Sequence, residues 1–181
     1  YSNRGAQQQG IAFRAPPGGA AGLKDAGFHV VSTAGNHCMD YGPDALLDTM
    51  DALRANNLIP VGTGRDLAEA RKPVIVERKG VRIGFLAFNS IMAEHDWAEA
   101  NRPGCNAIRI YSSDGKFYSG ETAKPRRSDI AASEGDVAAM VESVRQLKRD
   151  VDIAIVSFHW GLSFSPVDLA VYQREIGRAH V

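Results

Sequence analysis

Two short apolar runs constrain the fold of this chain more than any other feature of its sequence. Residues 29–34 (HVVSTA) and 152–158 (DIAIVSF) are each nearly continuous in apolar character. Such runs are typical of strands in a parallel sheet that is covered on both faces. Helical patterns alternate with the strand-like runs, and this order predicts an α/β fold in which both runs are fully buried.

Apolar stripes and capping residues predict the helices. Pro43 suits the first turn of a helix that ends at Asn56-Asn57, and Ser133 caps a second helix that closes with Lys148-Arg149. The stripes consist of Leu46, Leu47, Met50 and Leu53 in the first helix and of Val137, Met140, Val141, Val144 and Leu147 in the second.

The remaining segments hold β-hairpins and an irregular region. Residues 73–88 read as two strands joined through Lys79-Gly80. Residues 90–132 are the least regular part and are expected to be an insertion, with a further hairpin turn at Asp114-Gly115. A last helical pattern begins after Pro166.

Length and charge exclude several classes of protein. The 181 residues are expected to form one domain, and 21 basic and 21 acidic side chains leave no formal net charge. This balance argues against binding to nucleic acid or to an anionic membrane surface, and no apolar run is long enough to span a membrane. Two cysteines, Cys38 and Cys105, are too few for a disulfide scaffold and leave the compartment open.

Polar residues follow both apolar runs, where ligands gather in open α/β sheets. The first set is Gly35-Asn36-His37, in which an amide oxygen can bind a metal and an imidazole can move a proton near neutral pH. Gly35 is expected to allow a sharp turn that aims both side chains outward. The alternative is a turn that only ends the strand. Asp40 either orients His37 or starts the following helix.

The second set is His159-Trp160-Gly161. A strand would hold His159 rigidly as a ligand for zinc, manganese or iron, whereas the alternative is a hydrogen-bonded histidine at a strand end. Trp160 is expected to pack in the core. Asn36 and His159 do not complete a metal site, which needs at least three protein ligands, so the others must lie elsewhere.

Other reactive side chains have simpler interpretations. Glu94-His95-Asp96-Trp97 is expected to be a solvated loop, because successive residues point in different directions. Cys38 beside His37 could be a nucleophile, although a small packed residue is the alternative. Three arginines could hold an anionic substrate or lie on an ordinary surface: Arg102, Arg126 and Arg127.

Several motifs occur together in the order found in one protein family. Residues 26–64 (AGFHVVSTAGNHCMDYGPDALLDTMDALRANNLIPVGTG) resemble the CapA-type bacterial capsule synthesis, or poly-γ-glutamate biosynthesis, family. That family has a strand, an Asn-Asn-His-x-x-Asp-Tyr-Gly-like motif, a helix and a Gly-x-Gly turn. Residues 69–90 (EARKPVIVERKGVRIGFLAFNS) resemble its next hairpin. Residues 153–161 (IAIVSFHWG), with Pro166 and Gln173, resemble its HWG segment.

The resemblance implies a fold and a metal centre. The family is related to the calcineurin-like metallophosphatases, which bind two metal ions in a four-layer α/β/β/α sandwich. By this resemblance Asn36 and His159 are metal ligands, and His37 is the catalytic proton donor or a transition-state stabiliser. Asp40 is counted with His37 as a catalytic candidate because it could orient that ring, and not by the resemblance. Two divalent ions, manganese, iron or zinc, are implied as cofactors. Gly35 stands where the family often has asparagine.

The sequence also departs from the family pattern. No Gly-Asp motif precedes Tyr1, and the Gly-His-x-x-His-like motif would lie beyond the helix that still runs at Val181. His180 does not fit that motif. We therefore expect a fragment whose sandwich is incomplete at both termini and which holds about half of the metal site.

The implied function is capsule or poly-γ-glutamate biosynthesis in the cell envelope. The full-length parent would be a metal-dependent hydrolase of a phosphoester or another anionic linkage, in which His37 protonates the leaving group. The implied partners are an anionic polymer or phosphoester substrate and capsule synthase components. One alternative is a non-catalytic accessory that binds the polymer or a synthase. The other is a nucleotidase-like phosphohydrolase with Trp97 or Trp160 as its aromatic clamp.

Overall fold

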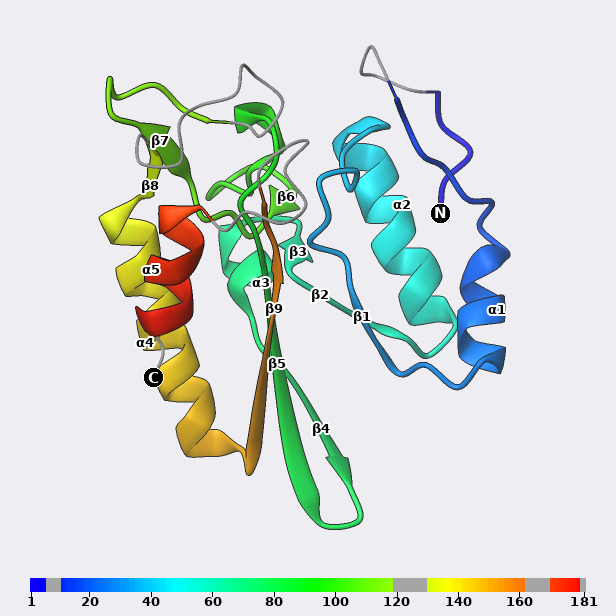
Figure 1. Cartoon of the computed structure of the whole chain (residues 1–181). Helices are drawn as coiled ribbons and strands as arrows, with labels where there is room; N and C mark the ends of the chain where they lie inside the picture. The colour runs from blue at the N-terminus through cyan, green and yellow to red at the C-terminus, as the bar shows by residue number, and fades with distance from the viewer. Residues whose placement is uncertain (6–10, 119–129, 162–169, 180–181) are drawn as a thin grey trace.

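The computed structural model describes residues 1–5, 11–118, 130–161 and 170–179 (Figure 1). Helices and strands alternate in these ranges, which confirms the α/β class. The helices are α1 (Gly19–Asp25), α2 (Gly42–Ala55), α3 (Leu67–Arg71), α4 (Glu134–Asp150) and α5 (Val171–Ala179). The strands are β1 (Val30–Ser32), β2 (Ile59–Val61), β3 (Thr63–Gly64), β4 (Val74–Arg78), β5 (Val81–Asn89), β6 (Gly104–Cys105), β7 (Ile110–Ser112), β8 (Ile130–Ala132) and β9 (Ile153–His159).

The longest strands form one mixed sheet with the order β4-β5-β9. β4 and β5 make the predicted antiparallel hairpin, and Lys79 and Gly80 between them have φ of 52° and 80°. Positive φ at both central residues is typical of a tight hairpin turn. β5 and β9 run parallel in a register that places Asn89 opposite His159. The carboxyl ends of these two strands therefore lie side by side.

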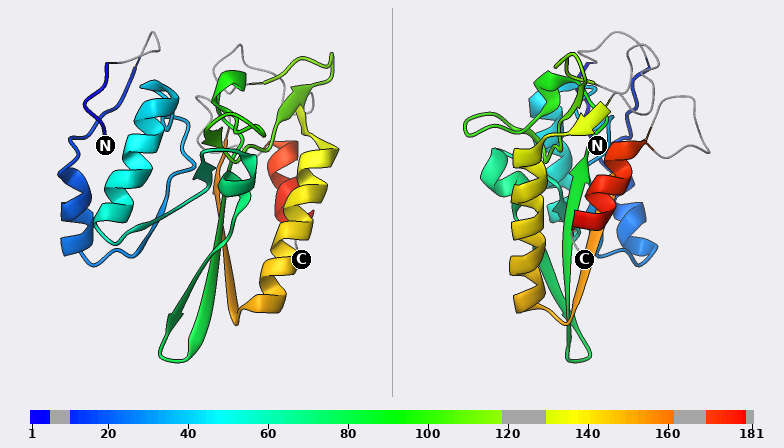
Figure 2. Two further views of the ribbon diagram at one scale, coloured as in Figure 1. Left: turned by 180° about the vertical axis from the view of Figure 1, so that it is seen from behind. Right: turned by 60° about the vertical axis from the view of Figure 1, so that its left-hand side comes forward.

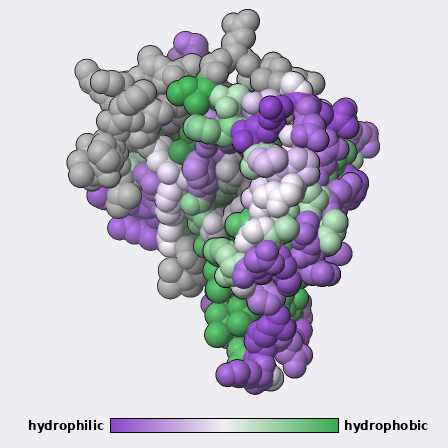
Figure 3. Space-filling model, turned by 90° about the vertical axis from the view of Figure 1, so that its right-hand side faces the viewer, coloured by the Kyte–Doolittle hydropathy of each residue, from purple (hydrophilic) through white to green (hydrophobic). Residues whose placement is uncertain are grey.

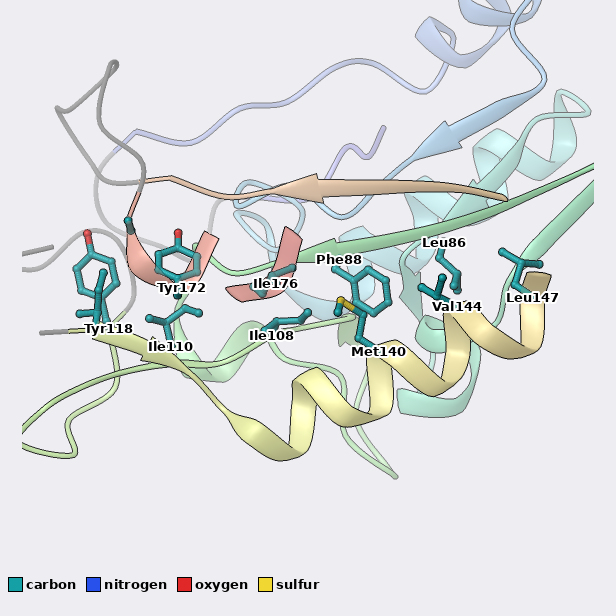
Figure 4. Packing of buried hydrophobic residues seen from close by; sticks show 12 residues of the cluster. Leu86, Phe88, Ile108, Ile110, Tyr118, Met140, Val144, Leu147, Tyr172 and Ile176 are labelled. Carbon is teal, nitrogen blue, oxygen red and sulfur yellow. The ribbon is translucent and has the colours of Figure 1, made fainter. Parts of the chain in front are cut away.

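Helices cover one face of this sheet. Figures 1 and 2 show α4 and α5 on one side of the sheet, and α1, α2, β1 and β2 on the other. Ser133 caps α4 as predicted, because its Oγ accepts a hydrogen bond from the backbone N–H of Asp136. The buried side of α4 packs with Leu86 and Phe88 of β5, and Tyr172 of α5 lies beside Tyr118 and Ile110 in the same cluster (Figure 4). This cluster is the main core.

The two apolar runs form strands but are not fully buried. β1 pairs with β2 in parallel, yet its residues are half-buried or exposed. Burial alternates along β9, where Ile153 and Ile155 are 47% and 43% exposed. The prediction of two covered faces is therefore wrong for the described residues. The reason is that α4 covers the face of β9 that holds Ala154 and Val156, while the opposite face has no comparable cover within these ranges.

A close approach fixes the end of β1 against β5. Gly62 has φ of 93°, and a Cβ there would lie 2.7 Å from the Cβ atoms of both Ala34 and Ala87. Only glycine avoids both the clash and the backbone strain at this position. The hydroxyl of Thr33 also bonds the carbonyl of Val61 at 3.1 Å. These contacts hold the turn that follows β1.

The segment 90–132 is ordered in its described part. β6 pairs with β3, and β7 pairs with β8. Tyr111 and Phe117 bridge across the expected turn at Asp114-Gly115, which confirms that hairpin. Within the described ranges, no helix combines the length and apolar character that a membrane crossing requires. Pro166, like His180, lies outside those ranges.

Candidate functional site

The two sets of polar residues that follow β1 and β9 meet in space. The Nε2 atom of His159 lies 3.0 Å from Oδ1 of Asn36, although 123 positions separate them in the sequence. His159 is the last residue of β9, and Asn36 lies in the turn between β1 and α2. Partial desolvation lowers the pKa of His159, and charge repulsion from His37 lowers this pKa further. His159 is therefore favoured in the neutral form, which is the form that binds metals.

His37 forms a second pair with Asp40. Its Nδ1 lies 2.9 Å and 3.1 Å from the two carboxylate oxygens of Asp40. Asp40 does not cap α2, because Tyr41 is the N-cap residue and no side chain caps it. The sequence allows Asp40 either to orient His37 or to start the helix, and the structure contains the contact with His37. It leaves Nε2 as the ring nitrogen of His37 that is available to a ligand.

A segment near the amino terminus covers the His37–Asp40 pair, a contact that no motif in the sequence predicts. The backbone N–H of Phe13 donates to Oδ2 of Asp40 at 2.7 Å. The Phe13 ring meets the His37 ring edge-on, with 4.5 Å between centroids and an angle of 88°. The Asp40 carboxylate is only 2% exposed, so these donors satisfy a buried charge. Residues 13 and 14 also line a cavity of about 250 Å³ beside His37.

Asn89 is a further polar residue at the same edge of the sheet. It shares a sheet face with His159 across the β5–β9 register and is fully buried. Its Oδ1 accepts a hydrogen bond from the N–H of Ile91 at 2.7 Å, whereas its Nδ2 has no partner within the described residues. Sequence reasoning missed it, although a polar residue at the end of an apolar strand is the same signal that singled out Asn36 and His159.

Gly35 does not have the expected role. Its φ is not positive, and a Cβ at this position would meet no atom within 4 Å. The chain turns through backbone hydrogen bonds instead: the N–H of Gly35 donates to the carbonyl of Thr33 at 2.9 Å, and the N–H of Cys38 donates to the carbonyl of Gly35 at 3.1 Å. The expected turn is present, but its backbone geometry does not depend on the conformational freedom of glycine.

The remaining candidates have structural roles. The thiol of Cys38 hydrogen-bonds that of Cys105. The pKa of Cys105 is raised, chiefly because the thiol is buried and to a smaller extent because of this contact. Cys38 packs beside Cys105 in an apolar cluster, as the packed interpretation predicts. Arg102 bonds Glu99 at 2.9 Å and the carbonyl of Trp97 at 3.1 Å, so it holds its own loop together. Arg126 and Arg127 lie outside the described residues.

The Glu94–Trp97 tetrad is only partly solvated. His95 is exposed, but Asp96 and Trp97 are buried, which corrects the prediction of a solvated loop. Trp97 meets Phe117 edge-on at 4.7 Å, and Trp160 stacks on Phe158 at 4.8 Å. Within residues 1–5, 11–118, 130–161 and 170–179, no three His, Cys, Asp or Glu side chains are grouped so that they could hold a metal ion.

Comparison with known proteins places these features in a family. The family model described as bacterial capsule synthesis protein PGA_cap matches residues 1–181. A probable polyglutamine synthesis accessory protein of Mycobacterium tuberculosis is 33% identical over 179 residues, which cover 94% of this chain and 42% of that protein. The PGA biosynthesis protein CapA of Bacillus subtilis is 28% identical over 158 residues, 87% of this chain and 34% of that protein.

A third relative is the capsule biosynthesis protein CapA of Bacillus anthracis, which is 33% identical over 82 residues, 45% of this chain and 20% of that protein. The chain spans less than half the length of these relatives. The match to the family model nevertheless extends over every residue, including the turn with Asn36 and the end of β9 with His159. The chain belongs to the bacterial capsule synthesis (PGA_cap) family.

Proposed function

We propose that this chain serves capsule or poly-γ-glutamate synthesis, and that Asn36 and His159 are two ligands of a metal-dependent, phosphoesterase-like site. The observation that carries the proposal is the 3.0 Å separation between Oδ1 of Asn36 and Nε2 of His159. Two donor atoms that each lie about 2.1 Å from one metal ion, at right angles, are about 3 Å apart. The pair therefore has the spacing of neighbouring ligands as well as that of a hydrogen bond.

The donor chemistry fits a divalent ion of the manganese, iron or zinc type. Imidazole nitrogen and amide oxygen are both ligands for these metals. The Asn36–His159 pair provides two donors, and the described residues add no cluster of further ligands. A complete centre of two ions would thus take its other ligands from outside the described residues. Metal ions bound there would activate water and stabilise negative charge.

His37 is the proton donor in this proposal. The Asp40 carboxylate accepts from Nδ1 and fixes the ring, so that Nε2 can carry a proton towards the leaving oxygen of an ester. Asp40 itself stays in contact with Phe13 and His37 and acts through His37 rather than on the substrate.

The exposed sheet face supports the four-layer sandwich in the whole protein. The register places Val76, Ile83 and Ile153 on one face, with Phe85 and Ile155 beside them. Figure 3 shows hydrophobic surface at the lower end of the molecule, where these strands lie. Apolar sheet faces are usually covered by another layer. The relatives extend well beyond the matched region, so they have the length to supply a second sheet.

A non-catalytic accessory role is the second candidate. The mycobacterial relative is described as an accessory protein, and two metal ligands alone do not make a hydrolase. A nucleotidase has less support, because its aromatic clamp would need a free ring. Trp97 is buried against Phe117 and has Arg109 over its ring, while Trp160 is stacked on Phe158.

Hydrolysis assays separate these candidates. The whole protein would be incubated with manganese and a chromogenic phosphomonoester or phosphodiester, beside its His37→Asn variant and a His95→Asn control. His95 is an exposed histidine outside the site. The proposal predicts turnover that falls by 10²-fold or more in His37→Asn, as expected for loss of a general acid, and stays unchanged in the control. Equal turnover in His37→Asn and the parent would contradict the assigned role, and absence of turnover in the parent would favour the accessory role.

A further inference from the structure

The cavity beside His37 has a composition that points to a specific class of ligand. It has a volume of about 250 Å³ and lies between residues 13–15, β1 and α2. We propose that this cavity binds an oxyanion, a phosphate or a carboxylate, and that Arg14 is the residue that holds it next to His37. The inference rests on the proposed function for the role of His37, and adds a substrate-binding residue to that site.

The contacts that Arg14 makes within the described residues leave its positive charge without a carboxylate partner. Its guanidinium lies 5.5 Å from the centre of the Tyr41 ring, and its Nη1 donates to the backbone carbonyl of Arg4 at 3.1 Å. Among the residues that the structure describes, no acidic side chain pairs with it. A guanidinium has five N–H donors, so most of its donors remain free for the two oxygens of an anion.

The residue before Arg14 contacts both His37 and Asp40. Phe13 donates its N–H to Asp40 and places its ring against His37. These two contacts fix the residue that immediately precedes Arg14, and the Tyr41 ring supports the guanidinium itself. A side chain that is already held in place loses less conformational entropy when a ligand binds. Arg14 lies at the surface, and these contacts hold its guanidinium near the cavity before an anion binds.

The lining of the cavity limits the size and character of the ligand. His37 and Tyr41 line it together with Arg14, and most of the remaining lining is apolar, with Val31 and Leu46 among it. At about 30 Å³ per water molecule, the volume corresponds to about eight waters. An oxyanion on a short carbon chain fits these limits. A phosphomonoester of a small alcohol and the carboxylate of a glutamate side chain share this chemistry.

Ligand titrations followed by NMR test the inference directly. The whole protein, freed of metal with a chelator, would be titrated with inorganic phosphate and separately with glutarate. Four proteins would be compared: the parent, Arg14→Gln, Arg14→Lys, and Arg78→Gln as a matched control. Arg78 ends β4, where its Nη1 lies 3.5 Å from the carbonyl oxygen of the adjacent Glu77. Signals of His37 and Tyr41 report on the cavity.

The expected result is saturable binding of at least one probe, with signal changes at His37 and Tyr41. Arg14→Gln should raise Kd at least tenfold, Arg14→Lys should raise it less, and Arg78→Gln should leave it unchanged. The probe that binds more tightly identifies phosphate or carboxylate as the preferred source. Parent-like Kd in Arg14→Gln, equal weakening in Arg78→Gln, or no saturable binding of either probe would each overturn the inference.

The outcome is separable from that of the metal proposal. The titration contains no metal, so it can be repeated with Asn36→Ala, which removes a proposed ligand but leaves Arg14 in place. Arginine-dependent binding that persists in Asn36→Ala supports the oxyanion site, whatever metal analysis shows. Conversely, a confirmed metal site together with arginine-independent binding contradicts the oxyanion site alone.

Discussion

Nε2 of His159 lies 3.0 Å from Oδ1 of Asn36, and this contact joins the carboxyl end of β9 to the turn after β1. Each side chain is placed by backbone that is fixed elsewhere. β9 is held by its parallel register with β5, and the turn after β1 is held through Thr33 and the close approach at Gly62. The site is thus a consequence of how β1 and β9 are anchored to β2 and β5.

Removal of the Asp40 carboxylate should destabilise the fold. Asp40→Ala leaves the N–H of Phe13 and Nδ1 of His37 without their acceptor. Each hydrogen bond contributes about 0.5–1.5 kcal/mol net, so loss of both should lower the free energy of unfolding in urea by about 1–3 kcal/mol. Asp44→Ala is the control, because its ion pair with Arg4 is exposed and contributes less than about 1 kcal/mol. Equal effects of the two changes would contradict this account of Asp40.

Substitution should destabilise the fold at one glycine and have little effect at another. Gly62→Ala introduces a Cβ that lies 2.7 Å from two neighbouring Cβ atoms, at a residue with positive φ. It should therefore lower the free energy of unfolding by about 1–3 kcal/mol. Gly35→Asn places its Cβ in open space and should change stability by less than about 1 kcal/mol. Thermal unfolding of both variants checks this contrast, which fails if Gly35→Asn is the more damaging change.

Stability should depend on pH through His159. The folded chain lowers the pKa of this residue from its ordinary value of 6.5. The unfolded chain then binds the proton at higher pH than the folded chain, so the free energy of unfolding falls as the pH drops below about 6.5. The free energy of unfolding in urea would be measured between pH 8 and pH 5 on protein freed of metal with a chelator. It should fall less steeply in His159→Gln than in the parent. Identical slopes would show that the surroundings of His159 do not lower its pKa.

The exposed sheet face gives a test of the sandwich. In the whole protein, a second sheet over β9 would bury Ile155, so Ile155→Asp should destabilise it by more than about 3 kcal/mol. Ile75 is a matched control, because it is equally exposed but lies on the opposite face of the sheet, at the edge strand. Ile75→Asp should cost about 1 kcal/mol or less. If both changes are equally mild, Ile155 is exposed in the whole protein as well.

Local patterns predicted the elements well, because their causes are local. Ser133, the Lys79-Gly80 turn and the stripe that contains Met140 each act within a few residues of the chain. The family could also be predicted, because the order of several motifs is far more specific than any one of them. Asn36 and His159 were found because each follows an apolar strand.

The remaining features depend on contacts between distant parts of the chain. A continuous apolar run such as β9 does not say how many layers cover it, so the exposure of Ile155 could not be predicted. Asp96 is buried although it is ionisable, because the loop folds back so that Trp97 pairs with Cys105 of β6. The contact of Phe13 with Asp40 joins residues 27 positions apart without any shared motif. The spacing of apolar residues along the chain cannot predict such contacts.

Metal content is the measurement that tests the central claim most directly. The whole protein and its Asn36→Ala, His159→Ala and His95→Ala variants would be loaded with manganese, dialysed and analysed for bound metal. Shared ligation by Asn36 and His159 predicts tightly bound metal in the parent and in His95→Ala, and loss of at least one equivalent in each of the other two variants. Equal metal content in all four proteins, or none in the parent, would contradict it.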